Sequence, residues 1–381
     1  MSEPFEIFLA GPPGLEPLLA EEAAGIGLPG PRPVPGGVVL EGGWPEVWRA
    51  NLHLRGATRV LARIASFRAL HLAQLDKRAR KVPWEATLRA GVPLRVEATC
   101  RASRIYHAGA ARARIAAAIG DRIGAPVAAE PPEDALREDA LSVRVRIDDD
   151  LCTISIDTSG AALHRRGHKQ EVNAAPMRET LAALFLAAAG YDGSEPVVDP
   201  MCGSGTLVIE AAEIAAGLAP GRSRSFAFER LATFDPAAWA ALRAAVRPRA
   251  TGWRFRGSDR DGGAVAMSRA NAERAGVAEI TDFARGPVSA LERPDGPPGL
   301  VMVNPPYGTR LGEGADLRPL YAALGAVLRA RFAGWRVGLV TSEAALARAT
   351  WLPFGPPGPP VPHGGLKVRL WQTGPLPTIP G

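Results

Sequence analysis

The sequence predicts an α/β protein in which two small α+β modules precede a doubly wound, mostly parallel sheet. Three observations carry this prediction. The chain has 381 residues, a length that suits two or three domains. Its first 160 residues alternate short strands with helices, and from about residue 174 the pattern changes to repeated strand–turn–helix units. Such repeated units favour a parallel sheet with helices on both faces.

The two α+β modules are expected at residues 1–56 and 57–160. In the first module the pattern predicts strands at 5–9 and 38–41 and helices at 15–24 and 44–54. In the second it predicts strands at 59–67 and 94–99, helices near 70–79 and 106–123, and a hairpin of strands at 141–147 and 152–157. The hairpin turns at Asp148-Asp149-Asp150, since aspartate tolerates turn conformations.

The parallel sheet is expected within residues 161–381, after a basic linker at 161–175. Its strand–helix pairs are predicted at 197–199 and 205–216, 253–259 and 263–275, 300–304 and 317–330, and 337–342 and 344–349. A tract rich in proline and glycine at 353–365 then leads, as a loop or hairpin connection, to a last strand at 366–371.

Composition excludes several classes of protein. Apolar residues make up 46% of the chain and charged residues 22%, which is ordinary for a soluble globular protein. No apolar stretch approaches the roughly 20 residues of a membrane helix, and the acidic N-terminus lacks the plan of a signal peptide. Cys100, Cys152 and Cys202 show neither metal-ligand spacing nor a disulfide pattern. We therefore expect a reduced, cytoplasmic protein with no metal site, no membrane association and no obligate protein partner.

Positive charge is concentrated in one part of the chain. Between Arg49 and Arg122 there are 16 basic and four acidic residues, a net charge of +12, whereas the whole chain carries +6. A basic block on an otherwise mildly acidic chain is typical of proteins that bind a phosphate backbone, although arginines on helix faces are also ordinary solvated surface. The block therefore indicates nucleic acid without establishing it.

The ten residues from Val197 to Thr206 join an apolar strand, an acid and a glycine-rich turn that opens a helix. Gly203 and Gly205 let a ligand lie against bare backbone, and amides at the start of the helix donate hydrogen bonds. No lysine is present to hold a β- or γ-phosphate, which disfavours a nucleoside triphosphate. Asp199 suits a ligand with an ammonium group, such as the methionine moiety of S-adenosylmethionine.

Two further strands end in polar residues. Asp259 comes one βα unit after the glycine turn, where an acid accepts hydrogen bonds from both ribose hydroxyls of a nucleoside. The strand predicted at 300–304 ends in the string Asn304-Pro305-Pro306-Tyr307. The Asn304 side-chain oxygen and the Pro305 carbonyl can accept both protons of an exocyclic amine, while Tyr307 stacks on the base. The structural alternative is a proline-terminated strand with a buried tyrosine.

Four other residues are poor candidates for catalysis. Cys202 has no neighbouring histidine and is expected to pack the glycine turn, and Cys152 alternates within an apolar strand and is expected in the core. His164 and His168 lie in the basic segment His164–Lys169 without ligand spacing to another histidine or cysteine. We expect both histidines to belong to an interdomain connector.

The string Asp199–Thr206 followed by Asn304–Tyr307 resembles motifs I and IV of amino-group methyltransferases. The likeness extends over nearly the whole chain, through segments at 8–9, 14–19, 36–41, 49–52, 101–109, 164–167, 175–183, 304–312 and 320–321. Together these segments resemble the bacterial THUMP-domain rRNA guanine-N2 methyltransferases of the RlmL type. The resemblance implies an N-terminal ferredoxin-like domain, a THUMP RNA-binding domain and a Rossmann-like class I methyltransferase domain that uses S-adenosylmethionine.

The resemblance also implies a reaction and roles for individual residues. The substrate would be a guanine in domain V of 23S rRNA, with the RNA bound through the block Arg49–Arg122 and the linker His164–Lys169. Asp259 would hold the ribose of the cofactor. The remaining cofactor residues would be Asp199, Met201, Gly203, Gly205 and Thr206 at the methionine end, and Pro176, Met177 and Thr180 at the side of the pocket. The target base would meet Asn304, Pro305, Pro306 and Tyr307.

The sequence departs from the family at one place. After the third strand the family usually has an acid beside the adenine, whereas Gly286 and Pro287 stand there in this chain and Asp282 comes too early in the strand. Three alternatives stay open: a tRNA acceptor-stem guanine-N2 methyltransferase, a DNA adenine-N6 or cytosine-N4 methyltransferase, and a catalytically silent RNA-binding chaperone. The residues of the two motifs favour the rRNA branch of the family. Because both motifs are intact, they argue against a protein without catalytic activity.

Overall fold

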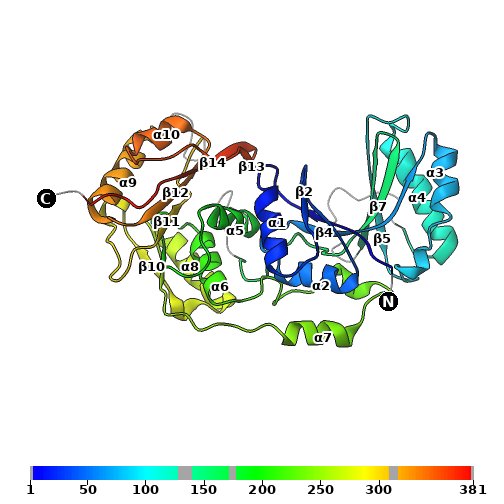
Figure 1. Cartoon of the computed structure of the whole chain (residues 1–381), viewed down its shortest axis with the longest axis horizontal. Helices are drawn as coiled ribbons and strands as arrows, with labels where there is room; N and C mark the ends of the chain where they lie inside the picture. Colours follow the sequence, from blue (N-terminus) through cyan, green and yellow to red (C-terminus); the bar gives the residue numbers. More distant parts are fainter. Residues whose placement is uncertain (1–2, 128–139, 171–176, 309–315, 379–381) are drawn as a thin grey trace. The chain divides into compact units, whose positions relative to one another are not determined.

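The computed structural model describes residues 3–127, 140–170, 177–308 and 316–378, and the chain divides into two compact units. The first unit comprises Met1–Gly11, Ala20–Leu163 and Arg224–Ala245. The second comprises Pro12–Leu19, His164–Ser223 and Val246–Gly381. Each unit is built on a seven-stranded sheet (Figure 1). Across the described ranges, no helix has both the length and the apolar character needed to cross a membrane.

The sheet of the first unit has the strand order β2-β3-β1-β4-β7-β6-β5. Its strands are β1 (Phe5–Ala10), β2 (Arg32–Val34), β3 (Gly37–Gly42), β4 (Arg59–Arg68), β5 (Leu94–Arg101), β6 (Leu141–Asp148) and β7 (Leu151–Asp157). Strands β5 and β6 pair in parallel and the other neighbours pair antiparallel. The predicted hairpin is present as β6 and β7, with Asp149 and Asp150 at φ of 49° and 61° in its turn.

Strand β4 joins the two predicted α+β modules into one sheet. Its first half pairs with β1, from Arg59 opposite Ala10 to Arg63 opposite Glu6, and its other edge pairs with β7 from Leu61 to Arg68. Both edges of β4 are therefore used, which a sequence pattern with period two does not reveal. The predicted boundary at residues 56 and 57 separates stretches of sequence, but the sheet continues from one stretch to the other.

Helix α1 (Glu16–Gly25) begins in the second unit and continues into the first from Ala20. The other helices of the first unit are α2 (Trp44–His53), α3 (Leu72–Ala79), α4 (Ala108–Ile123) and α7 (Pro236–Ala244), with 3₁₀ turns η1 (Trp84–Ala86) and η2 (Ala227–Arg230). Helix α4 shows why these boundaries arise. His107 Nδ1 accepts a hydrogen bond from the Ala110 amide at 3.0 Å, and Gly124 ends the helix in the left-handed conformation at φ 63°. Helices α3 and α4 lie side by side (Figure 1).

Residues 224–245 leave the second unit between two of its strands and belong to the first. Their aromatic side chains form a cluster in which Phe226 stacks on Phe228, with ring centroids 5.2 Å apart, and Trp239 meets Phe228 edge to face at 5.0 Å. Trp48 of α2 adds its ring to this cluster, 6.2 Å from Phe228. This segment, including η2 and α7, was not predicted as a part of the N-terminal modules.

The sheet of the second unit has the order β10-β9-β8-β11-β12-β14-β13. Its strands are β8 (Val197–Asp199), β9 (Phe255–Asp259), β10 (Thr281–Arg285), β11 (Leu300–Val303), β12 (Arg336–Thr341), β13 (Val361–His363) and β14 (Leu366–Gln372). The five strands from β10 to β12 pair in parallel, whereas β14 is antiparallel to β12 and β13. The prediction of a mostly parallel α/β sheet is confirmed.

The helices of the second unit are α5 (Glu179–Ala188), α6 (Thr206–Ala215), α8 (Gly262–Ala275), α9 (Arg318–Arg331) and α10 (Ala344–Ala349), with 3₁₀ turns η3 (Ala278–Ile280) and η4 (Val288–Ala290). The central strands β8 and β11 are fully buried, as the apolar strands of a covered parallel sheet should be. After β8 the chain adds β9 and β10 on one side, and β11 and β12 lie on the other. The strand order therefore reverses between β8 and β11, and open α/β sheets bind ligands in the crevice at such a point.

Candidate active site

Three predicted site residues end neighbouring strands of the second sheet. Asp199 is the last residue of β8, Asp259 is the last residue of β9, and Asn304 directly follows β11. Because β9, β8 and β11 are adjacent and parallel, their carboxyl ends lie at one edge of the sheet. The structure thus brings these three side chains to the point where the strand order reverses.

The glycine turn after β8 is held against β9 and α8 by hydrogen bonds. The Cys202 amide donates to the Ser258 carbonyl at 2.9 Å, and the Gly203 amide donates to Asp259 Oδ2 at 3.0 Å. From α8, the Ser268 hydroxyl donates to the Gly203 carbonyl at 2.8 Å. Ser268 was not predicted from the sequence, because nothing in the pattern of α8 marks one serine as the partner of a distant turn.

Gly203 and Gly205 are needed for different reasons. Both have positive φ, 53° and 82°, a conformation that other residues rarely adopt. A Cβ added to Gly203 would meet no atom within 4 Å, so the backbone there faces open space that a ligand can enter. A Cβ added to Gly205 would lie 3.1 Å from Ser268 and from Ile209, so Gly205 permits the close packing of α6 on α8.

Asp199 is a buried acid without a basic partner. Its side chain is 2% exposed, the Met201 amide donates to its Oδ1 at 3.0 Å, and in the described part of the chain no basic side chain forms an ion pair with it. Burial, opposed by the hydrogen bond from the Met201 amide and aided by the charge of Asp259, raises the pKa of Asp199 to about 8. A ligand that carries an ammonium group would supply the missing positive charge.

Asp259 has a structural role in addition to the predicted one. Besides the bond from Gly203, its Oδ1 accepts a hydrogen bond from the Asp261 amide at 3.0 Å. The carboxylate is partly exposed and has about four lone-pair sites, so it can accept further hydrogen bonds from a ligand. Asp259 therefore ties the glycine turn to the end of β9 while keeping capacity for ribose hydroxyls.

The segment Asn304–Gly308 is positioned from two other elements. The hydroxyl of Tyr321 in α9 donates to the Pro306 carbonyl at 3.1 Å, and the Gly308 amide donates to Glu343 Oε1 at 2.9 Å. Glu343 stands between β12 and α10, at the same edge of the sheet. No role was predicted for Tyr321 or Glu343. Glu343 could have been predicted from its position just after a buried parallel strand, where site residues often lie.

Asn304 presents an acceptor that lacks a donor. Its Oδ1 is buried, and among the described residues no group donates a hydrogen bond to it. A buried acceptor that has lost its hydration and gained no partner is costly, typically by about 1–3 kcal/mol. The position of this atom after β11 makes it a site for a donor on a ligand.

Tyr307 is wholly buried, with an exposed fraction of 0%. The predicted stacking of its ring on a base therefore requires the ring to become accessible when the substrate enters. Stacking by Tyr307 stays a prediction.

The helix at the side of the predicted cofactor pocket is α5. Met177 and Thr180 are buried, with exposed fractions of 4% and 2%, and Pro176 lies outside the described residues. Helix α5 packs on α6, the helix that follows the glycine turn, which places Thr180 in an element next to that turn. Thr206, the first residue of α6, is 8% exposed.

The structure agrees that no acid of β10 stands at the place expected beside the adenine, where Gly286 and Pro287 follow the strand. Asp282 is the second residue of β10 and pairs with Arg256, whereas the last residue of β10 pairs with Asp259. Asp282 thus lies toward the amino end of its strand, away from the ligand edge. At that edge the Gly286 amide donates to the Asp259 carbonyl at 2.9 Å.

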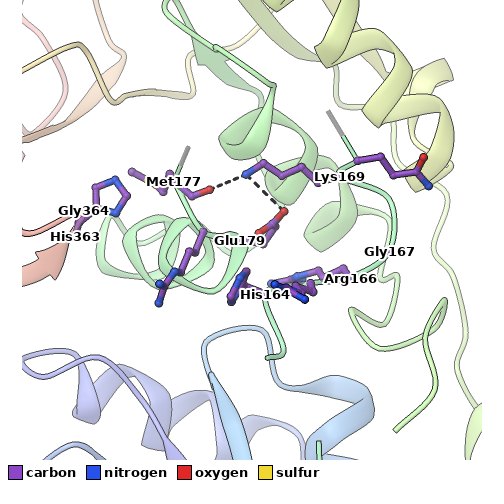
Figure 2. A pocket seen from close by; sticks show the side chains of 11 residues that line it. His164, Arg166, Gly167, Lys169, Met177, Glu179, His363 and Gly364 are labelled. Carbon is purple, nitrogen blue, oxygen red and sulfur yellow. Dashed lines mark hydrogen bonds and ion pairs between the residues drawn. The ribbon is translucent and has the colours of Figure 1, made fainter. Parts of the chain in front are cut away.

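The segment His164–Lys169 is only partly exposed, and several of its basic side chains face acids. Arg166 is 1% exposed and forms an ion pair with Glu210 at 3.1 Å, and the buried His168 lies 3.8 Å from Glu213. Lys169 donates to the Met177 carbonyl at 2.7 Å and lies 3.6 Å from Glu179 (Figure 2). The sequence analysis interpreted this string as a basic connector that contacts RNA. It did not foresee the ion pairs, because the acids come from α5 and α6 and are distant in the sequence.

The basic block Arg49–Arg122 is partly neutralised by acids outside it. Arg59 pairs with Asp157 at 2.6 Å and Arg104 lies 3.8 Å from Asp150. Arg63 pairs with Glu6. Such pairs reduce the local excess of positive charge that the sequence count indicated, and RNA binding through the block stays a prediction.

Both cysteine predictions agree with the structure. Cys152 is 0% exposed, and burial raises the pKa of its thiol to about 12. Cys202 is 6% exposed with Sγ 3.7 Å from the Ser268 hydroxyl, and burial raises the pKa of its thiol as well. Thiols held in the protonated form are poor nucleophiles.

Three protein-family models match the chain in order. They describe an RlmL ferredoxin-like domain at residues 6–61, a THUMP domain at 71–157 and an RMKL-like methyltransferase domain at 166–351. The chain is 37% identical over 365 residues to the ribosomal RNA large subunit methyltransferase K/L of Chromohalobacter salexigens, which covers 92% of this chain. The chain spans 50% of the length of that relative.

Two solved structures resemble the whole chain. A predicted N6-adenine-specific DNA methylase from Listeria monocytogenes has a TM-score of 0.86 and 29% identity, and the match covers 98% of this chain and 97% of that one. A protein assigned as a methyltransferase and solved in complex with SAH has a TM-score of 0.84 and 25% identity, and the match covers 98% and 99% of the two chains.

Proposed function

We propose that the chain, which matches RlmL-type ferredoxin-like, THUMP and methyltransferase domains in order, transfers a methyl group to the exocyclic N2 amine of a guanine in RNA. The RNA is 23S ribosomal RNA, in keeping with the name of the relative from Chromohalobacter salexigens. Ribosomal RNA as substrate places the protein in the cytoplasm.

One observation supports an amine as the acceptor group: Asn304 Oδ1 is a buried acceptor without a donor. The N2 amine of guanine has two N–H groups, and its lone pair is delocalised into the ring. Hydrogen bonds from these N–H groups to Asn304 Oδ1 and to the Pro305 carbonyl draw the nitrogen toward tetrahedral geometry and localise the lone pair. The contacts strengthen as the new N–C bond forms, so they lower the barrier more than they tighten substrate binding.

S-adenosylmethionine is the methyl donor, and the residues present fit it. The uncompensated carboxylate of Asp199 matches the ammonium group of its methionine end, and the open space at Gly203 admits a ligand beside the turn. Asp259 accepts from the ribose hydroxyls. When bound, the cofactor supplies an electrophilic methyl group and is converted to SAH. SAH is the ligand in one of the similar structures.

No general base has to be poised near neutral pH in this proposal. Asn304 does not titrate. The amine nitrogen loses one of its two protons only after the bond to the methyl group has made that nitrogen acidic. The contribution of the protein is therefore the alignment of the amine with the methyl group and the oriented acceptors around it.

A DNA adenine-N6 methyltransferase is the second candidate, because the Listeria monocytogenes protein carries that name and Asn304 could accept from any exocyclic amine. A transfer assay separates the candidates. Purified protein and methyl-labelled cofactor are incubated in turn with unmodified 23S rRNA, tRNA and DNA, and the products are digested to nucleosides. We expect label in N2-methylguanosine from 23S rRNA; label in tRNA or in N6-methyladenosine from DNA would replace the proposal.

A further inference from the structure

A cavity of about 590 Å³ lies in the second unit beside the start of α5 (Figure 2). Its walls come from the segment 164–170, from Met177–Glu179 and from the turn after β13. The lining residues are His164, Arg165, Arg166, Gly167, Lys169, Gln170, Met177, Arg178, Glu179, His363 and Gly364. The volume is in the range of small-ligand pockets, about 300–1,000 Å³, and exceeds what a single carboxylate or phosphate group needs.

The wall of the cavity carries an excess of positive charge. Arg165, Arg166, Lys169 and Arg178 line it, and Glu179 is the one acid among the described lining residues. Glu179 is already engaged, since it lies 3.6 Å from Lys169. Arg166 is balanced by Glu210 outside the cavity. Arg178 is exposed, and in the described structure no carboxylate lies within ion-pair distance of it.

His164 lies in the positive field of these side chains. Its Nδ1 is buried, and no hydrogen-bond partner for it exists among the described residues. Burial, followed by the charges of Arg178 and Arg165, lowers the pKa of His164 to about 4. The imidazole is therefore neutral at physiological pH, so one of its ring nitrogens can donate a hydrogen bond to an anion.

The β13–β14 hairpin, which lines the cavity, also contacts the segment that would hold the target base. His363 and Gly364, at the turn between β13 and β14, line the cavity. Two residues further along the same hairpin, Leu366 packs on Gly308, since a Cβ added to Gly308 would lie 3.1 Å from Leu366 Cδ1. Gly308 closes the segment that begins at Asn304. The β13–β14 hairpin thus borders the cavity at His363 and Gly364 and contacts Gly308, four residues after Asn304.

We propose that this cavity binds a backbone phosphate and sugar of the RNA strand next to the target guanine, with Arg178 as the charged contact and His164 as a hydrogen-bond donor. This inference rests on the proposed function for the identity of the strand. A nucleotide turned out of an RNA helix must have its flanking phosphates fixed, because the base is otherwise free to rotate away from Asn304. A cationic pocket of nucleotide size, lined by the hairpin that contacts Gly308, meets that need.

Binding of a fluorescent single-stranded oligo-uridylate tests the proposal without depending on methylation. The variant is Arg178→Gln, and Arg256→Gln is the matched control, because Arg256 is an exposed arginine toward the amino end of β9. We expect Arg178→Gln to weaken RNA binding about tenfold and to reduce the slope of log K against log salt concentration by about 0.7, the value for one phosphate contact on a single strand. Arg256→Gln should leave both quantities near wild type.

The affinity for S-adenosylmethionine, measured by calorimetry on the same variants, separates the two sources of anionic charge. We expect Arg178→Gln to keep the wild-type cofactor affinity. If Arg178→Gln weakens cofactor binding and leaves RNA binding intact, the cavity serves the cofactor carboxylate and the proposal is wrong. It is also wrong if both arginine variants lose the same RNA affinity. A third outcome is that only Arg178→Gln loses RNA affinity and that no guanine is methylated in the transfer assay. That outcome would support RNA binding by the cavity and contradict the proposed function.

Discussion

Asn304 is the single residue on which the proposed chemistry depends most. Replacing it with alanine removes the buried acceptor Oδ1, whereas replacing it with aspartate keeps an acceptor in a side chain of the same shape. We expect Asn304→Ala to lower the single-turnover rate of methyl transfer on the order of 100-fold, with little change in the affinities for cofactor and RNA, because its contact matters most in the transition state. Asn304→Asp should retain part of the rate. A wild-type rate for Asn304→Ala would remove this residue from the mechanism.

Asp199 links cofactor binding to stability. Its pKa is raised from 3.8 to about 8 in the folded protein, so the folded state holds a proton that the unfolded state releases between these values. The stability that this residue contributes is fully present below about pH 3.8 and is lost as the pH rises to about 8. Asparagine does not ionise, so the Asp199→Asn variant does not lose this stability as the pH rises. We expect the ligand-free variant to melt at a higher temperature than wild type at pH 8, with a smaller difference at pH 5.

The same variant should bind S-adenosylmethionine at least about tenfold more weakly, because a charged hydrogen bond contributes about 1.5–3 kcal/mol. Thermal melts and calorimetry on one pair of proteins measure both effects. Equal melting temperatures at both pH values, or an unchanged cofactor affinity, would mean that Asp199 is not an uncompensated buried acid that awaits a cation.

At the scale of elements, the junction between β12 and α10 supports the catalytic segment through Glu343. The Gly308 amide donates to its carboxylate at 2.9 Å. Glu343→Gln keeps an acceptor at the same length and Glu343→Ala removes it. We expect the alanine variant to lose about fivefold in transfer rate, corresponding to about 1 kcal/mol for one hydrogen bond at an exposed site, and the glutamine variant to stay near wild type. If both variants behave alike, the hydrogen bond does not position Gly308.

Most elements were predictable because their pattern is local. The strand predicted at 197–199 matches β8 and the helix predicted at 263–275 matches α8 within one residue, since an apolar run and a terminal glycine mark them. Strands β2 and β13 were not predicted: each has three residues and contains proline, and each exists only because a neighbouring strand pairs with it. Asp199, Asp259 and Asn304 were found because strand ends are readable, whereas Ser268 and Glu343 depend on packing between distant elements.

At the scale of the whole molecule, the sequence did not reveal that residues 224–245 belong to the first unit. Trp48 contacts Phe228 and Phe234 of this segment, with ring centroids 6.2 Å and 6.1 Å apart. A truncated protein that begins at residue 161 would therefore leave an aromatic cluster without Trp48. We expect this truncation to aggregate, because exposed aromatic surface favours association. Replacing residues 224–245 with a short flexible linker in the same truncation should lower this aggregation; both truncations lack Pro12–Leu19 of the second unit equally, so their difference reports on residues 224–245.

Light scattering and calorimetry on the two truncations check this account of the segment. The linker-containing protein should bind S-adenosylmethionine with near wild-type affinity, since Asp199, Gly203 and Asp259 all belong to the second unit. A simple truncation that stays monomeric at high concentration would contradict the assignment of residues 224–245 to the first unit.

Nucleoside mass spectrometry of ribosomal RNA tests the central claim most directly. The measurement compares RNA from the wild-type strain with RNA from three others. These are a strain that lacks the gene, the same strain complemented with the wild-type protein, and the same strain complemented with the Asn304→Ala variant. The account predicts that N2-methylguanosine is lost from 23S rRNA in the deletion strain, returns with the wild-type protein and does not return with Asn304→Ala. An unchanged N2-methylguanosine content of 23S rRNA in the deletion strain, with a modified nucleoside missing from tRNA or DNA instead, would contradict it.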